Sequence, residues 1–178
     1  MNPHANASNG STEPAAAAAV SYLAALNRRM TADGCTVTSP PWRDHPVVAG
    51  ARGDRKARWF GTKVEVFVFA AAVPEVDLVT LGEFTGWAMD YAKSLRRGIA
   101  GARNAAFVLP ALVGARVQPE AAQWAAQDAR ILGTTLISRP ITVETTPQGI
   151  RTSMYRGGTV WGGMFTNHVL GKAALYFP

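Results

Sequence analysis

The stretch Lys63-Val64-Glu65-Val66-Phe67-Val68-Phe69-Ala70-Ala71-Ala72-Val73 decides the fold of this chain. It is rich in β-branched and aromatic residues, and its length and apolar character are typical of a strand buried on both faces. Glu65 lies inside it, and a buried carboxylate requires a cationic partner, a metal ion or a proton. The stretch therefore predicts a central strand that carries one residue of chemical interest.

The segments before this strand predict one helix and two extended segments. Residues 1–12 are small and polar, which is typical of a disordered tail, and residues 13–178 are long enough for a single α/β domain. Ser11 or Thr12 can cap a helix that ends at Asp33-Gly34. Its expected core residues are Val20, Leu23, Leu26 and Met30. Residues 35–38 and 46–49 are expected to be extended, and residues 52–58 to form a loop or hairpin tip.

The segments after the strand predict alternating helices and strands. Asp77 is expected to cap a helix with a buried face of Leu81, Phe84, Ala88, Tyr91 and Leu95. Gly82 and Gly86 are expected to permit close approach to a strand. Residues 105–113, 134–138 and 141–145 are predicted strands, a second helix begins at Pro119, and residues 150–155 are expected to pair back after a turn.

The C-terminal tail, residues 157–178, is rich in glycine and aromatic residues and is expected to form irregular strands. Its large apolar side chains must cover the protein's own sheet or meet a partner, since a monomer seldom leaves so many in water. Symmetric self-association is a common outcome when an apolar patch remains, so we expect a homodimer.

This order of elements (helix, three strands, helix, strand, helix, strand) resembles the restriction-endonuclease-like superfamily, the PD-(D/E)xK nucleases, over roughly residues 14–145. The resemblance implies a mixed central sheet flanked by helices, here followed by a β-rich tail. It also implies phosphodiester chemistry at a Mg²⁺ ion held by two carboxylates, with a lysine nearby.

The family pattern has an acid on the second strand and acid-x-Lys on the third. The third strand here reads Lys63-Val64-Glu65, with Phe67 where the family has its lysine. Lys63 and Glu65 still share a face, because residues two apart on a strand do so. The resemblance therefore implies Glu65, Lys63, Asp54 and Asp44 as catalytic candidates, and Glu65 and Asp54 as metal ligands. The alternatives are a salt bridge that holds Glu65 at the strand end, or a small-molecule pocket near it.

Two basic zones predict contact with DNA or RNA. The net charge is +6, and residues 52–58 hold four cations and one acid just before Trp59-Phe60, a combination suited to phosphate contact and base stacking. The alternative is a solvated loop whose aromatic residues return to the core. A second zone near residue 100 is partly explained by the preference for cations at a helix end. The expected nucleic-acid-binding residues are Arg52, Arg55, Lys56, Arg58, Arg96, Arg97 and Arg103.

The remaining features are negative. Cys35 is the only cysteine, so one chain can form neither a disulfide nor a zinc site built on several cysteines. We find no apolar stretch long enough to span a membrane and no signal sequence. These features favour a cytoplasmic protein.

Overall fold

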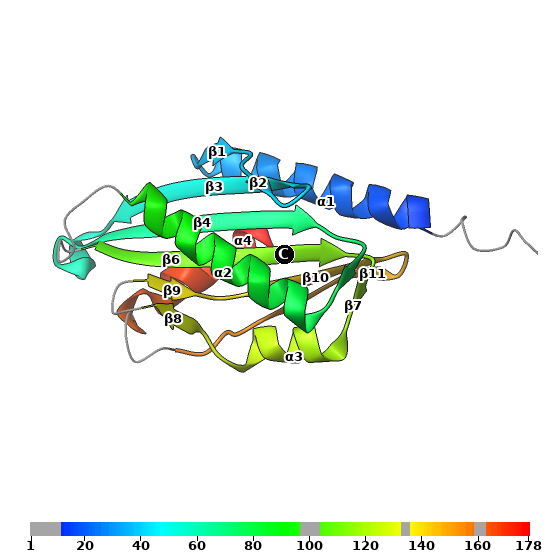
Figure 1. Cartoon of the computed structure of the whole chain (residues 1–178). Coiled ribbons are helices and arrows are strands. Elements are labelled where there is room, and N and C mark those ends of the chain that lie inside the picture. Colours follow the sequence, from blue (N-terminus) through cyan, green and yellow to red (C-terminus); the bar gives the residue numbers. More distant parts are fainter. Residues whose placement is uncertain (1–11, 97–103, 133–135, 159–162) are drawn as a thin grey trace, which may run out of the picture.

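The computed structural model describes residues 12–96, 104–132, 136–158 and 163–178. Within these residues one sheet lies between two layers of helices (Figure 1). The helices are α1 (Thr12–Ala32), α2 (Leu78–Leu95), α3 (Pro119–Gln127) and α4 (Thr166–Tyr176), with short 3-10 turns η1 (Ala57–Trp59) and η2 (Gly163–Phe165). The expected α/β class, a mixed sheet flanked by helices, is confirmed.

The described residues contain nine strands in the main sheet. The long ones are β3 (His45–Arg55), β4 (Lys63–Ala72) and β6 (Asn104–Gly114). The shorter ones are β1 (Thr36–Thr38), β2 (Pro41–Trp42), β8 (Arg130–Leu132), β9 (Leu136–Ser138), β10 (Ile141–Thr146) and β11 (Gly149–Met154). A separate pair is formed by β5 (Glu75–Val76) and β7 (Arg116–Val117).

The sheet order is β1-β3-β4-β6-β10-β11. The first three strands are antiparallel, β4, β6 and β10 are parallel, and β11 returns antiparallel. Along one side of β6, β9 pairs with Ala106–Val108 and β10 takes over at Ala111. Pro110 falls between the two, and proline is tolerated where strand pairing is interrupted. The predicted stretch around Glu65 is therefore a central strand, paired on both sides.

The two faces of the sheet carry separate cores. Alternate residues of β4 (Val64, Val66 and Val68) face α1 and α4, while Phe67 and Phe69 face α2 and α3. Gly50 on β3 leaves room for Met30 of α1, because a Cβ atom there would lie 2.5 Å from the Met30 sulfur. Both helix layers thus lie close enough to exclude water from most of β4 and β6.

The helix predictions hold with local corrections. Asp77 caps α2 by accepting a hydrogen bond from the Thr80 N–H at 2.8 Å. Gly82 and Gly86 were expected to permit a close strand, but a Cβ atom at either position would meet nothing within 4 Å. In α1, Val20 is 61% exposed, because the buried stripe passes through Ala19, Leu23 and Leu26. The helix also begins at Thr12, inside the segment expected to be disordered; residues 1–11 lie outside the described part.

The prediction of a β-rich tail is wrong. The described part of the tail forms η2 and α4, and α4 lies behind the sheet in Figure 1. Its buried side chains belong to the core on the α1 face. The spacing of Val169, Ala173 and Tyr176 is helical, and this periodicity decides the structure despite the glycines around it. Most large apolar side chains of the described tail pack into the chain's own core, so the tail no longer supplies the argument for self-association. The buried ones are Phe165, Val169, Ala173, Tyr176 and Phe177. A homodimer remains a prediction.

No helix in the described residues is both long and apolar enough to cross a membrane.

Candidate functional site

The candidate site follows from the register of β3 and β4. Gly53 pairs with Glu65, and Arg55 pairs with Lys63, so these four residues share the face covered by α2. Asp54 pairs with Val64 and lies on the opposite face, toward α1 and α4. The strand pair therefore separates the predicted site residues into two groups.

Glu65 is held by two cations. The Lys63 Nζ donates to its Oε1 at 2.7 Å, and the Arg96 Nε lies 3.6 Å from its Oε2. The Glu65 side chain is 18% exposed, so these partners compensate a partly desolvated charge. A Cβ atom on Gly53 would lie 2.4 Å from the Lys63 Cε, so glycine leaves the space that the Lys63 side chain occupies. Lys63 and Glu65 thus form the salt bridge that was the alternative to a metal site.

The other carboxylates do not join Glu65. Asp54 contacts Arg52 at 2.9 Å and His168 at 3.1 Å on the far face of the sheet. Asp44 lies in the turn between β2 and β3. It precedes Gly53 by nine residues, or roughly 30 Å at about 3.3 Å per strand residue. Of the four catalytic candidates, only Lys63 and Glu65 meet, and the predicted ligand pair of Glu65 and Asp54 does not form one site.

The described residues around Glu65 offer no set of ligands suited to a magnesium ion. Both oxygens of Glu65 already face cations, and the described residues contain no group of three or more His, Cys, Asp or Glu side chains placed to hold a metal. Mg²⁺ binding therefore stays a prediction from the resemblance, without a converging set of carboxylates to support it.

A groove of about 390 Å³ opens on the α2 face beside Glu65. Its floor is formed by Ala49 and Ala51 of β3 and by Phe67 and Phe69 of β4, its rim by β1, and its opposite wall by the end of α2. Tyr91 on that wall stacks on Trp87 at 5.3 Å between ring centroids, and meets Phe69 edge-on at 5.7 Å. The groove is therefore apolar and aromatic, with the Lys63–Glu65–Arg96 ion pairs at one end.

The tip between β3 and β4 is the second candidate. Residues 52–55, expected in a loop, continue β3, and the tip proper is η1 with its flanking residues. Trp59 is buried, with its ring against Phe165 and His168. Lys56 and Arg58 lie over the Trp59 ring at 5.3 and 5.9 Å. The expectation that aromatic residues of this arm return to the core therefore holds for Trp59 alone.

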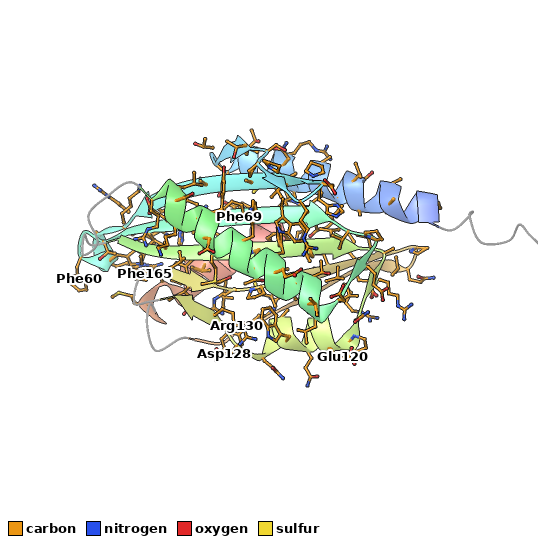
Figure 2. The ribbon with its side chains drawn as sticks, in the orientation of Figure 1. Phe60, Phe69, Glu120, Asp128, Arg130 and Phe165 are labelled. Atoms are coloured by element: carbon orange, nitrogen blue, oxygen red, sulfur yellow. The ribbon has the colours of Figure 1, made fainter. Side chains whose placement is uncertain are left out.

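Phe60 behaves differently from Trp59. It is 79% exposed and lies at the end of the hairpin (Figure 2). Its φ is +51°, a left-handed conformation that is a genuine outlier for a bulky residue. Such a conformation costs about 1–2 kcal/mol. The left-handed backbone of Phe60 ends η1, with its N–H donating to the Ala57 carbonyl, and it holds an exposed aromatic ring next to Lys56 and Arg58 in the sequence.

The other predicted cations divide as follows. Arg55, Lys56 and Arg58 are exposed at the tip. Arg52 lies on the α1 face and pairs with Asp33 at 3.2 Å and with Asp54 at 2.9 Å. Arg96 pairs with Glu65. Arg97 and Arg103 lie outside the described residues.

A polar network on the α1 face was not predicted from the sequence. Asp33, just after α1, accepts hydrogen bonds from Lys172 and Tyr176 of α4, each at 2.5 Å. Arg52 links Asp33 to Asp54, which contacts His168 of α4. The sequence shows Lys172 as the only charged residue of the tail, but nothing in it reveals that the partner is 139 residues away.

The network shifts the titration of its members. Burial raises the pKa of the Asp33 carboxyl, but the hydrogen bonds from Lys172 and Tyr176 outweigh this effect, and the pKa is lowered overall. Burial also raises the pKa of Tyr176, and its hydrogen bond to Asp33 adds to this. Burial raises the pKa of Cys35, whose sulfur lies 3.2 Å from the Tyr176 hydroxyl. Cys35 is therefore a neutral thiol at neutral pH, which does not suit a nucleophile.

His168 makes the network sensitive to mild acid. Burial lowers the pKa of His168 below its ordinary value, and the nearby Asp54 only partly offsets this. As pH falls below about 6.5, the unfolded chain takes up a proton that the folded chain resists, so stability decreases. We expect His168→Gln to flatten the decrease in unfolding free energy between about pH 6.5 and 5, as measured by urea titration at several pH values.

His45→Gln is the matched control. His45 is the first residue of β3, where its ring lies against Trp42 and not against the network of Asp33, Asp54 and His168. Parallel decreases for wild type and His168→Gln would show that other groups cause the acid sensitivity.

No protein-family model matches this chain, and the curated proteins contain no significant relative.

Proposed function

We propose that this domain binds single-stranded nucleic acid through the tip of the β3–β4 hairpin. The observation that carries the proposal is Phe60, exposed and in a strained backbone conformation beside three exposed cations. An aromatic ring supplies a stacking platform for a base, and the cations contact phosphates. The cations are Arg55, Lys56 and Arg58.

The energetics favour a ligand for Phe60. Leaving a phenylalanine side chain in water forgoes roughly 1.5–3 kcal/mol relative to burying it. Stacking on a base contributes about 1–3 kcal/mol and tolerates any sequence, since every base has a π-face. Together with the +6 net charge, this supports weak, sequence-independent binding with a strong dependence on salt.

The proposal is one of binding without cleavage. The element order resembles the restriction-endonuclease-like nucleases, but Glu65 is paired with Lys63 and Arg96, and Asp54 lies on the other face of the sheet. Among the described residues, no pair of carboxylates is placed to support two-carboxylate metal chemistry. We therefore expect a labelled oligonucleotide to remain intact when it is incubated with the protein and MgCl₂.

The test is fluorescence anisotropy with a labelled oligo-dT strand at 50 and 200 mM salt. We expect Phe60→Ala to weaken binding about 5- to 100-fold, which corresponds to the loss of one stacked base. The triple variant Arg55→Gln, Lys56→Gln, Arg58→Gln should also reduce the slope of log K against log salt by about 2, because single strands contribute roughly 0.7 per phosphate contact.

The matched control removes the same number of positive charges from a part of the surface away from the tip. Arg28, Arg116 and Arg151 are exposed and lie away from the tip. The triple variant of these three arginines to glutamine should bind nearly as well as wild type. If both triple variants lose affinity equally, the binding reflects net charge alone and the proposed site is incorrect. Failure of the wild type to bind at low salt would also remove the proposal.

A further inference from the structure

We propose that the groove on the α2 face is a binding site for a small organic phosphate with a planar ring, of the size of a mononucleotide. This site is distinct from the hairpin tip and does not rest on the proposed nucleic-acid binding. The evidence is the shape of the groove, the nature of its wall and the charge at one end.

The groove exists because small residues line β3 beside the end of α2. α2 runs diagonally over the sheet and packs mainly on β6 and β9, so β1 and the adjacent part of β3 lie beside it (Figure 1). The β3 residues that face this side are Ala49, Ala51 and Gly53. Their neighbours on β4 are Phe67 and Phe69, so the floor descends from large side chains to small ones. A volume of about 390 Å³ lies in the usual range for small-molecule sites.

The wall of the groove suits a planar ring. Tyr91 and Leu95 of α2 line it, and Tyr91 is half-buried and fixed by stacking on Trp87. Aromatic rings held in this way offer a flat surface at little cost in side-chain entropy. The opposite rim is formed by Thr36 and Thr38, whose hydroxyl groups can hydrogen-bond to polar atoms of a ligand.

The charged end of the groove suits a phosphate group. Lys63 and Glu65 line it, and Arg96 pairs with Glu65. Two cationic side chains, Lys63 and Arg96, pair with the one carboxylate of Glu65, which leaves a local charge of about +1 to attract the phosphate monoester, an anion at neutral pH. The Lys63 side chain is 36% exposed, so it can reach a ligand while it keeps its bond to Glu65. A neutral ligand would gain nothing from the positive charge at this end of the groove.

The test is isothermal titration of the full chain with AMP and with 1-naphthyl phosphate, compared with adenosine and with inorganic phosphate. We expect both ring phosphates to bind at least tenfold more tightly than either adenosine or inorganic phosphate. Absence of binding by both ring phosphates would overturn the proposal. Equal binding of AMP and adenosine would overturn it as well, because the charged end would then contribute nothing to affinity. Equal binding of AMP and inorganic phosphate would overturn it because the aromatic wall would contribute nothing.

Three variants locate the binding. Ala51→Leu fills the floor and should reduce AMP affinity at least tenfold, and Lys63→Gln should reduce it about tenfold while the affinity for adenosine stays unchanged. Lys63 is partly exposed, so this variant keeps the test valid if Ala51→Leu fails to fold. Phe60→Ala should bind AMP like wild type. If instead Phe60→Ala abolishes AMP binding and Lys63→Gln does not, AMP occupies the hairpin tip and the groove assignment is incorrect.

Discussion

A chain ended at Arg156 is expected to lose its cooperative thermal unfolding transition. The deletion removes α4 and with it four large side chains that are at most 5% exposed in the full chain: Phe165, Val169, Tyr176 and Phe177. At roughly 1.5–3 kcal/mol for each buried side chain, the loss is about 6–12 kcal/mol. A whole domain has a stability of only about 5–15 kcal/mol, so little or none should remain.

The measurement is circular dichroism and differential scanning calorimetry on both chains. Leu175→Ser in the full-length protein is the control, because Leu175 lies on the same helix but is 46% exposed. It should change the melting temperature by only a few degrees. A truncated chain that unfolds cooperatively would contradict the prediction. If that chain were also monomeric while the full chain is a dimer, the tail would be the dimer interface that the sequence led us to expect.

Asp33→Ala is expected to destabilise the fold strongly for a single polar substitution. The Asp33 carboxylate meets Lys172, Tyr176 and Arg52, and its removal leaves the Lys172 ammonium, whose side chain is only 12% exposed, without its anion. We expect a loss of about 2–4 kcal/mol, between the values for exposed and fully buried ion pairs. Urea unfolding at neutral pH measures it.

The pH dependence distinguishes the charge of Asp33 from its shape. The folded-state pKa of Asp33 is lowered, so its contribution is complete above the unfolded value of about 4 and is lost as pH falls through the folded pKa. The difference in stability between wild type and Asp33→Asn should therefore shrink below about pH 4. Glu83→Gln is the control, because Glu83 pairs with Arg43 in a half-exposed position. A difference that stays constant with pH would contradict an electrostatic role for Asp33.

Local pattern was sufficient for the central elements of the fold. The β-branched run of β4, the Asp77 cap of α2 and the turn between β10 and β11 are each encoded within about ten residues. The small strands β2, β5, β7 and β8 were missed, because these short segments form only where a neighbouring strand is already in place. The tail was predicted incorrectly since its glycines and aromatic residues outweighed a helical spacing that only the underlying core makes decisive.

The candidate site was partly predictable for the same reason. Alternation along one strand places Lys63 and Glu65 on a common face, and their contact follows. The position of Asp54 depends on how far β3 continues and on its register with β4, and neither can be determined from one strand alone. The link between Asp33 and α4 joins the two ends of the chain, and it follows from packing rather than from any motif.

The glycine opposite Glu65 makes the chemistry of this face depend on a single position. Gly53 is the cross-strand partner of Glu65, and a side chain there would have its Cβ about 4.5–5.5 Å from that of Glu65. An aspartate at this position would create the paired carboxylates that Asp54, one residue later, cannot provide. It would also displace Lys63, whose side chain occupies that space. The present sequence thus places a lysine in the space where a second acid would fit, and the ion pair of Lys63 with Glu65 depends on the glycine at this one position of β3.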